Sequence, residues 1–164
     1  MNKLTLQTHL RFAVLSFSLL YLTSYSLHAA DTSTDTPAAK PAAVNALQTG
    51  RDAVKAKDWD KAIVQFKLAT VQEPKNADAY NMLAYSYRKQ AKPDLPKAFE
   101  NYNLALKLDP KHKGAHEYIG EAYLMDNKPV EAERHLELLA TICGNKTCEE
   151  YEDLAKAISA YKKK

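Results

Sequence analysis

Glycine is scarce in this chain, and segments in which polar and apolar residues alternate are missing. The 164 residues include only four glycines, and the body of the chain is rich in Ala, Lys, Leu, Glu and Tyr with few β-branched runs. Because strands favour β-branched and aromatic residues in alternation, no segment is predicted to be a strand. The length suits one modest domain. The sequence therefore predicts an all-α protein with a single folded domain.

A surplus of charge of either sign is also missing. Lys and Arg together number 23, against 20 Asp and Glu. Two of the 23, Lys3 and Arg11, lie in the first thirty positions, which hold no acidic residue, so the rest of the chain has 21 basic and 20 acidic residues. Nucleic acids and anionic membranes select proteins with a basic face. The near balance predicts that neither is a partner.

An apolar run long enough to span a membrane is missing as well, since a spanning helix needs about 20 predominantly apolar residues. The run from Phe12 to Leu22 follows two basic residues and gives way to polar residues and then to Ala29 and Ala30. This order is typical of a secretory signal peptide. We therefore expect residues 1–30 to be removed near Ala29 or Ala30, and an uncleaved membrane anchor is the alternative.

Export to the periplasm or the medium follows from this expectation. No cysteine stands near the cleavage region, which excludes a lipid anchor there, and the released chain is expected to have no stable membrane insertion. Residues 31–42 contain two prolines and no large apolar side chain. Such a segment cannot bury enough apolar surface to offset the entropy of ordering, which predicts a flexible linker.

The main positive feature is a self-similarity with a period near 34 residues. An alanine recurs three times, followed four residues later by a bulky apolar side chain and seven residues later by Ala or Leu. The three sets are Ala62, Phe66 and Ala69; Ala98, Tyr102 and Ala105; and Ala132, Leu136 and Leu139. Pro74 and Pro110 close the first two copies. The repetition predicts successive helical hairpins built to one pattern.

This pattern resembles the tetratricopeptide repeat (TPR) family, whose signature of a large residue, Leu, Gly or Ala, Tyr, and then Ala, Phe, Ala and Pro is met at most positions. The resemblance implies a right-handed α-solenoid of three hairpins at about 43–76, 77–112 and 113–146. The helices are expected near 43–56, 60–72, 77–91, 96–108, 113–126 and 130–142. Within each hairpin a small residue is expected to let the two helices approach closely: Gly50, Ala84 and Gly120.

A last helix is predicted within residues 147–164. Thr147 and Glu150 have the spacing of a capping box, in which each side chain bonds the other residue's backbone N–H. An apolar stripe with helical spacing follows, formed by Tyr151, Leu154, Ala155, Ile158 and Tyr161. This stripe is expected to cover the end of the third hairpin, as the terminal cap of a repeat array must.

Cys143 and Cys148 flank the turn before this helix and are the only two cysteines. An even number of cysteines in an exported chain is typical of disulfides, and closing so short a loop contributes roughly 2 kcal/mol. We predict a disulfide between them. A redox or metal-handling role for the pair, together with nearby histidines such as His112 and His116, is the alternative.

No motif of an enzyme is found. His116 and Glu117 begin a metalloprotease-like pattern, but Gly120 stands where the second zinc-binding histidine is needed. A Gly-rich phosphate loop and a serine elbow are both missing. The sequence therefore predicts a protein that is not an enzyme and that uses neither a cofactor nor a metal.

The resemblance further implies a concave groove, lined by the first helix of each hairpin, that binds a protein or peptide. The implied groove residues are Arg51, Lys55, Asn81, Tyr85, Arg88, Lys89, Glu117, Tyr118 and Glu121. Basic residues gather at one end, acidic residues at the other and tyrosines between them, which suits a peptide of matching charge order. A merely solvated charged face is the alternative.

The chaperone-binding members of the family hold a terminal carboxylate with a clamp of Lys and Asn. Here that clamp is absent, because other residues stand in its places: Leu47, Arg51, Gly114 and Tyr118. The expected function is thus an exported scaffold for a protein or peptide, such as an envelope or assembly factor, whose partner the resemblance does not name.

Overall fold

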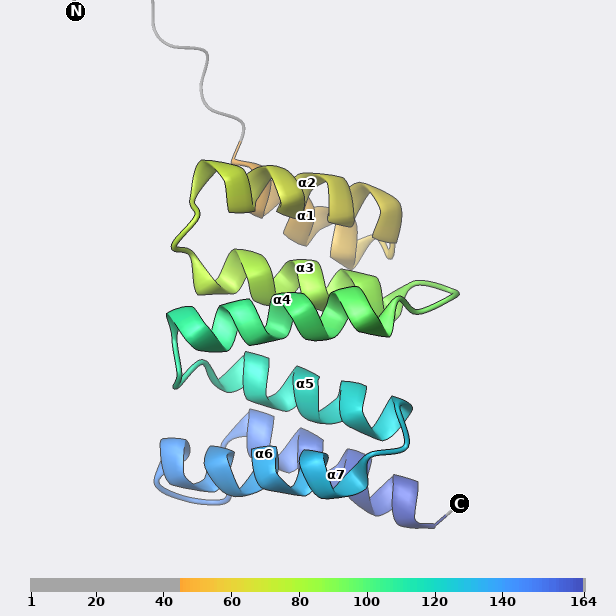
Figure 1. Cartoon of the computed structure of the whole chain (residues 1–164), viewed down its shortest axis with the longest axis vertical. Coiled ribbons are helices and arrows are strands. Elements are labelled where there is room, and N and C mark those ends of the chain that lie inside the picture. The colour runs from red at the N-terminus through yellow and green to blue at the C-terminus, as the bar shows by residue number, and fades with distance from the viewer. Residues whose placement is uncertain (1–44, 164) are drawn as a thin grey trace, which may run out of the picture. The chain divides into compact units, whose positions relative to one another are not determined.

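The computed structural model describes residues 45–163, which form seven α-helices and, within that range, no strand. The helices are α1 (Ala46–Lys55), α2 (Trp59–Gln72), α3 (Ala77–Lys89), α4 (Leu95–Leu108), α5 (Lys113–Met125), α6 (Pro129–Cys143) and α7 (Glu149–Lys162). They pack as the hairpins α1/α2, α3/α4 and α5/α6, one after another, with α7 on the last (Figure 1). The expectation of an all-α solenoid with a terminal helix is confirmed. The predicted signal peptide and linker lie outside the described residues.

Most helices begin at a side chain that accepts a hydrogen bond from a backbone N–H of the first turn. The capping residues are Asn45, Asp58, Asn76, Asp94 and His112. Such caps satisfy amides that have no partner within the helix and contribute about 1 kcal/mol each. None of the described helices is long and apolar enough to cross a membrane.

The capping box predicted for the last helix is wrong. Thr147 donates both its backbone N–H and its hydroxyl to Asn145 Oδ1, at 2.9 and 3.1 Å, so it belongs to the preceding turn. Cys148 occupies the N-cap position without a side-chain hydrogen bond. The acidic residues of the first turn remain to favour the helix, because negative charge is stabilising at a helix N-terminus.

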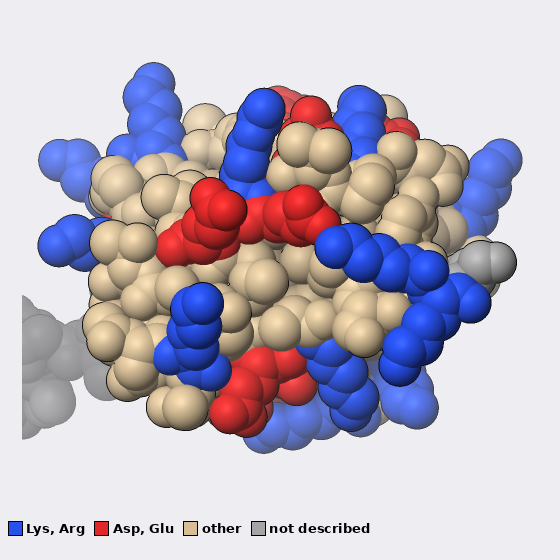
Figure 2. Space-filling model, turned by 90° about the horizontal axis from the view of Figure 1, so that it is seen from below, with Lys and Arg blue, Asp and Glu red and all other residues tan. Residues whose placement is uncertain are grey.

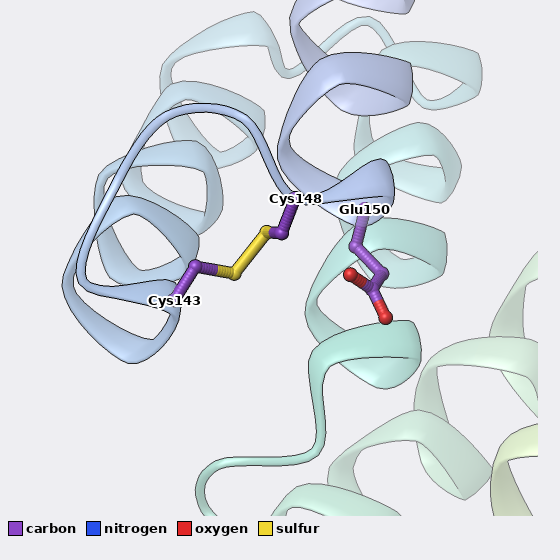
Figure 3. A group of neighbouring side chains, drawn as sticks. All are labelled: Cys143, Cys148 and Glu150. Atoms are coloured by element: carbon purple, nitrogen blue, oxygen red, sulfur yellow. A yellow bond between two sulfur atoms is a disulfide. The ribbon is translucent and has the colours of Figure 1, made fainter.

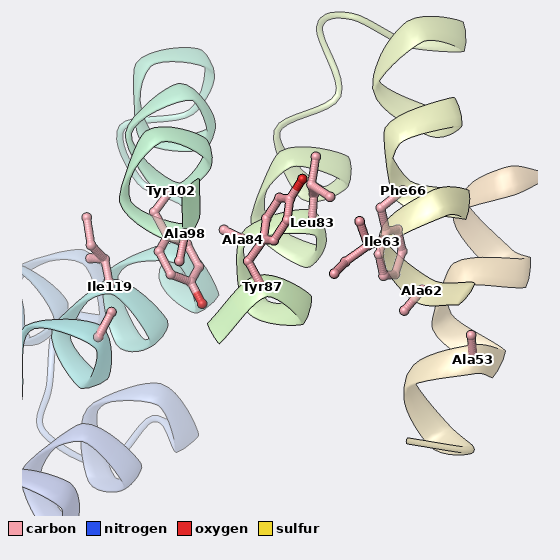
Figure 4. Packing of buried hydrophobic residues seen from close by; sticks show 11 residues of the cluster. Ala53, Ala62, Ile63, Phe66, Leu83, Ala84, Tyr87, Ala98, Tyr102 and Ile119 are labelled. Carbon is pink, nitrogen blue, oxygen red and sulfur yellow. The ribbon is translucent and has the colours of Figure 1, made fainter. Parts of the chain in front are cut away.

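The repeated alanines lie on the buried side of the second helix of each hairpin. Ala62, Phe66, Ala98 and Tyr102 are completely buried (Figure 4), and so is Ala132. Leu136, the third member of the bulky set, is only partly buried, and Leu139 one turn later is fully buried instead. The third hairpin therefore keeps the buried alanine of the pattern, but its large buried side chain is Leu139 and not Leu136.

At both Gly50 and Gly120 a side chain of another helix leaves no room for a Cβ atom, but the two glycines face different helices. A methyl group on Gly50 would lie 2.5 Å from Cε1 of Phe66, which is the predicted contact within the hairpin. A methyl group on Gly120 would lie 2.7 Å from Cδ2 of Leu154, which belongs to α7. The prediction for Gly120 is thus wrong in its partner: this glycine makes room for the terminal helix.

The terminal helix α7 packs more extensively against α5 than against α6. Leu154 and Ile158 are buried in a second apolar cluster with Leu124, Ala132 and Leu139. The apolar stripe predicted from the sequence therefore does cover the last hairpin, as a cap must. Because α7 packs mainly against α5, it also reaches the side of the molecule that is lined by the first helices of the hairpins.

We expect Gly50→Ala to lower the free energy of unfolding by about 1–3 kcal/mol, because the new methyl group overlaps the ring of Phe66. This loss exceeds the gain of at most about 1 kcal/mol that alanine gives a helix. Urea denaturation followed by circular dichroism measures the change. Gly114→Ala is the matched control, since its methyl group would meet nothing closer than 3.5 Å. Adding Phe66→Leu should recover part of the loss in Gly50→Ala, and no recovery would contradict the assigned contact.

Candidate functional site

Three aromatic side chains form a row across the first and second hairpins and the start of the third. The rings of Tyr85 on α3 and Tyr118 on α5 have centroids 4.8 Å apart, and Trp59 at the start of α2 meets Tyr85 edge-on at 6.1 Å. All three are partly exposed. Partial exposure of large rings leaves amphipathic surface available to a partner.

Arg88 holds the two tyrosines in place. Its guanidinium carbon lies 5.3 Å from the ring centre of Tyr85 and 5.6 Å from that of Tyr118, which are cation–π distances. Its Nη1 is 2.6 Å from Oε2 of Glu121, and its Nε donates to the hydroxyl of Tyr102 at 3.3 Å. Arg88 is only 6% exposed. Burial raises the pKa of Tyr118 to about 12 and also raises the pKa of Tyr85, so both rings stay neutral beside the cation.

This geometry corrects the predicted strip of free charges. Arg88 and Glu121 were expected at opposite ends of the groove, but they form one ion pair in its middle, in which Arg88 is buried and Glu121 is partly exposed. Arg51 is likewise bound to Asp78 of the second hairpin. The basic residues left exposed are Lys55, whose Nζ is 3.3 Å from Asp52, and Lys89, whose Nζ is 5.9 Å from the ring centre of Tyr85. Spacing along a helix could not reveal these pairs, because they join different helices.

Glu117 lies on the side of α5 that faces α7, and only 8% of it is exposed. Burial raises its pKa to about 8, and the nearby carboxylates of Glu121, Asp153 and Glu150 add to the rise. The side chain therefore carries a proton at neutral pH for most of the time. It belongs to the α5–α7 interface, and the prediction that it forms an acidic end of the groove is wrong.

Asn81 is also buried, and its Oδ1 has no hydrogen-bond partner among the described residues. Its Nδ2 lies 3.5 Å from the place where a methyl group on Gly114 would stand, so it faces the start of α5. Of the nine predicted groove residues, the structure buries Asn81, Arg88 and Glu117. Lys55, Lys89, Tyr85 and Tyr118 keep exposed surface, and so do Arg51 and Glu121, whose ion-paired side chains are 42% and 28% exposed.

A pocket of about 460 Å³ adjoins the Arg88–Glu121 pair, between α5 and the second half of α7. Its walls are mainly apolar and its lining residues are Arg88, Glu121, Leu124, Met125, Asn127, Ala157, Ala160 and Tyr161. Tyr161 donates its hydroxyl to Asn127 Oδ1 at 3.3 Å. The sequence analysis missed the contribution of α7. The small residues Ala157 and Ala160, beside the apolar stripe, were the available signal.

Charge is segregated at the end of the molecule that α6 and α7 form. In a view onto this end, acidic side chains gather toward the middle and Lys and Arg surround them (Figure 2). Glu149, Glu150 and Glu152 in the first turn of α7 are exposed or partly exposed. The near-zero net charge therefore conceals local fields of both signs.

His112, His116 and His135, the histidines of the described residues, do not form a metal site with the cysteines. His112 caps α5, and Nε2 of His116 donates to the carbonyl of Pro110 at 3.0 Å. Nδ1 of His116 must then accept the bond from Nδ1 of His135 at 2.9 Å. Burial lowers the pKa of His135 to about 4, and it also lowers that of His116.

The two cysteines are joined as a disulfide across the turn between α6 and α7 (Figure 3). Glu150 is the one further side chain near them that could contribute to a metal site in the described part of the chain, and its Oε2 lies 3.7 Å from Nζ of Lys113. Cysteine binds a metal ion as a thiolate, and the sulfur atoms of a disulfide are not thiolates. In this oxidised form the turn is a covalent link between the last hairpin and its cap.

Comparison with solved structures decides the fold. The TPR2B domain of yeast Sti1, in its pHsp70 complex, matches with a TM-score of 0.65 at 18% identity, over 72% of this chain and 94% of the other. The first TPR of Spaghetti (RPAP3), bound to the HSP90 peptide SRMEEVD, matches with a TM-score of 0.61 at 23% identity, over 70% of this chain and 91% of the other. SycD, the type III secretion translocator chaperone of Yersinia enterocolitica, matches with a TM-score of 0.63 at 17% identity, over 71% of this chain and 81% of the other.

The chain has the TPR fold. No family model matches it, and no curated protein does. In the TPR fold the first helices of the hairpins line the inner face, so the aromatic row of Tyr85 and Tyr118 belongs to that face. Because α7 leans on α5, the pocket beside Arg88 extends the same face toward the end of the chain.

We expect Arg88→Glu to lower the free energy of unfolding by about 3–5 kcal/mol, because it replaces a buried cation by a carboxylate beside Glu121. Lys89→Glu, one residue along and exposed, is the matched control and should cost less than about 1 kcal/mol. Denaturant titrations measure both. Replacing Arg88 and Glu121 together by Met should restore most of the stability, since no unpaired charge is then buried. Equal losses in the Arg88 and Lys89 variants would contradict the buried pair.

The raised pKa of Glu117 predicts that stability falls with rising pH. Between the unfolded pKa of 4.5 and the folded pKa of about 8, the folded chain keeps a proton that the unfolded chain has released. The free energy of unfolding therefore decreases with pH across that range. The lowered pKa values of His116 and His135 give the opposite slope, but only below about 6.5. The decrease should thus be visible from pH 6.5 to 8.

Urea titrations across this range measure the slope. Glu117→Gln should flatten it and make the protein more stable at pH 8 than the parent. Glu137→Gln, at an exposed position on α6, is the control and should leave the slope unchanged. An unchanged slope in Glu117→Gln would show that the carboxyl is ionised in the folded protein.

Proposed function

We propose that this protein is a scaffold that binds a protein or a peptide, without catalysis, on the face that carries Tyr85 and Tyr118. The observation that carries this proposal is the row of partly exposed rings fixed by a buried arginine. Side chains held before binding lose little conformational entropy when a partner arrives, so their contact area is converted to affinity efficiently. Tyr and Trp are also the residue types that most often dominate binding energy at interfaces.

The ligand that suits this surface is an extended or helical segment with an apolar side chain and an acidic group near it. The pocket between α5 and α7 has mainly apolar walls, and the two charges at its edge neutralise each other, so an uncharged side chain fits there. Lys89 is exposed beside Tyr85 and would attract an acidic group. The solved neighbours in complex with peptides support a peptide or protein as the class of ligand.

Export is part of the proposal. The charged, apolar and small-residue order of the first thirty residues supports a secretory signal, and the disulfide supports an oxidising compartment, such as the periplasm, where such bonds persist. An exported scaffold of this size is suited to a role in envelope assembly. Sequencing the N-terminus of the protein from the extracytoplasmic fraction tests this part: it should begin at Ala30 or Asp31, and a retained Met1 in the cytoplasm would contradict it.

The binding face is tested with a photo-crosslinking amino acid placed at Tyr85, and at Thr70 on α2 as the control. A partner other than a second copy of this chain should be captured from cells at the first position and not at the second. With that partner purified, Tyr85→Ala should accelerate its dissociation, because the ring carries contact area. Lys89→Glu should slow association and weaken its salt dependence. Capture at Thr70 alone, or kinetics indifferent to both substitutions, would rule out this face.

A further inference from the structure

The outer face of the solenoid carries almost all of the exposed large apolar side chains. Within the described residues they lie on the second helices of the hairpins, with the single exception of Met125. The members on those helices are Val64, Leu68, Val71, Leu104, Leu108, Val130 and Leu138. Met125 lines the pocket of the inner face, but none of the other seven does, so a separate surface has to be explained.

Three of these side chains occupy the same place in each repeat. Leu68, Leu104 and Leu138 each stand six residues after the buried alanine of their hairpin, and they are 41%, 38% and 46% exposed. Equivalent positions of successive repeats form a row across a solenoid. A leucine at one exposed position in all three hairpins therefore gives the outer face one apolar row.

At two positions beside this row the charge changes sign from one end to the other, and the exposed Arg134 on α6 offsets one of the negative charges there. One residue before and five residues after the buried alanine, α2 has Lys61 and Lys67, whereas α6 has Glu131 and Glu137. None of these four side chains has an ion-pair partner among the described residues, and Lys67 Nζ lies 5.8 Å from the ring centre of Tyr87.

The middle hairpin is neutral at the same two places. Lys97 is paired with Asp94 at 2.7 Å, and Asn103 carries no charge. The row therefore runs from a basic end through a neutral centre to an acidic end, and it has a leucine at each step.

We propose that this row binds a second copy of the same chain about a two-fold axis at Leu104. In that arrangement Leu104 meets Leu104 of the second copy, and Leu68 meets Leu138 of the second copy in two equivalent contacts. The lysines of α2 then face the glutamates of α6 of the other copy at both ends. A two-fold interface must be complementary to itself, and a row with a neutral centre and opposite ends satisfies that condition.

The physical magnitudes make this a weak dimer. Three partly exposed leucines on each copy bury much less area than the interfaces of permanent dimers, so a dissociation constant in the micromolar range or weaker is expected. The outer face of a solenoid is convex, so the central pair of leucines makes the closest contact. The charges at the two ends act mainly by steering association and excluding the parallel arrangement, which would oppose like charges.

Sedimentation equilibrium on the protein purified as cells produce it tests the proposal. Its weight-average mass should rise from monomer toward dimer between about 10 µM and 1 mM at low salt. Leu104→Glu should weaken association at least about tenfold. Ser159→Glu, which adds the same charge at an exposed position of α7 outside the outer face, is the control and should leave association unchanged. A wild-type chain that stays monomeric at 1 mM, or a Leu104→Glu chain that associates as strongly, would overturn the proposal.

Charge reversal tests the antiparallel pairing. The chain with Lys61→Glu and Lys67→Glu is acidic at both ends, and the chain with Glu131→Lys and Glu137→Lys is basic at both ends. Each alone should associate at least about tenfold more weakly than wild type, because like charges then face each other. An equimolar mixture should recover wild-type association within about threefold, since every contact is again between opposite charges. No recovery, or undiminished association of either variant alone, would overturn the two-fold arrangement. Binding at the Tyr85 face is measured separately, so either proposal can fail without the other.

Discussion

The structure depends on the close packing of helices at points where one of them carries nothing larger than alanine. Ala62, Ala98 and Ala132 are completely buried at these points, and Gly50 has no room even for a methyl group beside Phe66. Close packing in a protein interior leaves few voids, so a larger residue there must push the helices apart. The position of every later hairpin depends on these contacts, because in a solenoid each unit packs only on its neighbours.

A second constraint comes from the cost of burying charge. Arg88 is tolerated in the interior because Glu121, the hydroxyl of Tyr102 and two tyrosine rings surround its guanidinium. One side chain thus joins α3, α4 and α5 and sets the spacing of the exposed rings at the same time. Glu117 has no such partner, and its carboxyl is kept largely protonated instead. The inner face is therefore ordered by neutralised charges and is less polar than its sequence indicates.

The repeat could be predicted from the sequence because its signal is local and recurs. The spacing from Ala62 to Phe66 and Ala69 recurs from Ala98, and one repeated pattern constrains the length and direction of every helix. The site could be predicted only in part. The pairing of Arg88 with Glu121 joins residues on different helices. The packing of α7 against α5 depends on how Leu154 fits against Gly120. Helical spacing places a residue on a face, but it does not say which neighbour occupies that face.

The chain contains a single tryptophan, and its place in the aromatic row gives the molecule an optical reporter of its own. Trp59 begins α2 and meets the ring of Tyr85 on α3, so its indole senses the junction between the first two hairpins. Indole emission responds to the polarity around the ring, and tyrosines at such distances transfer excitation energy to it. Intrinsic fluorescence therefore observes the inner face directly, without a label, and it distinguishes an event at this junction from one at the disulfide-linked end of the chain.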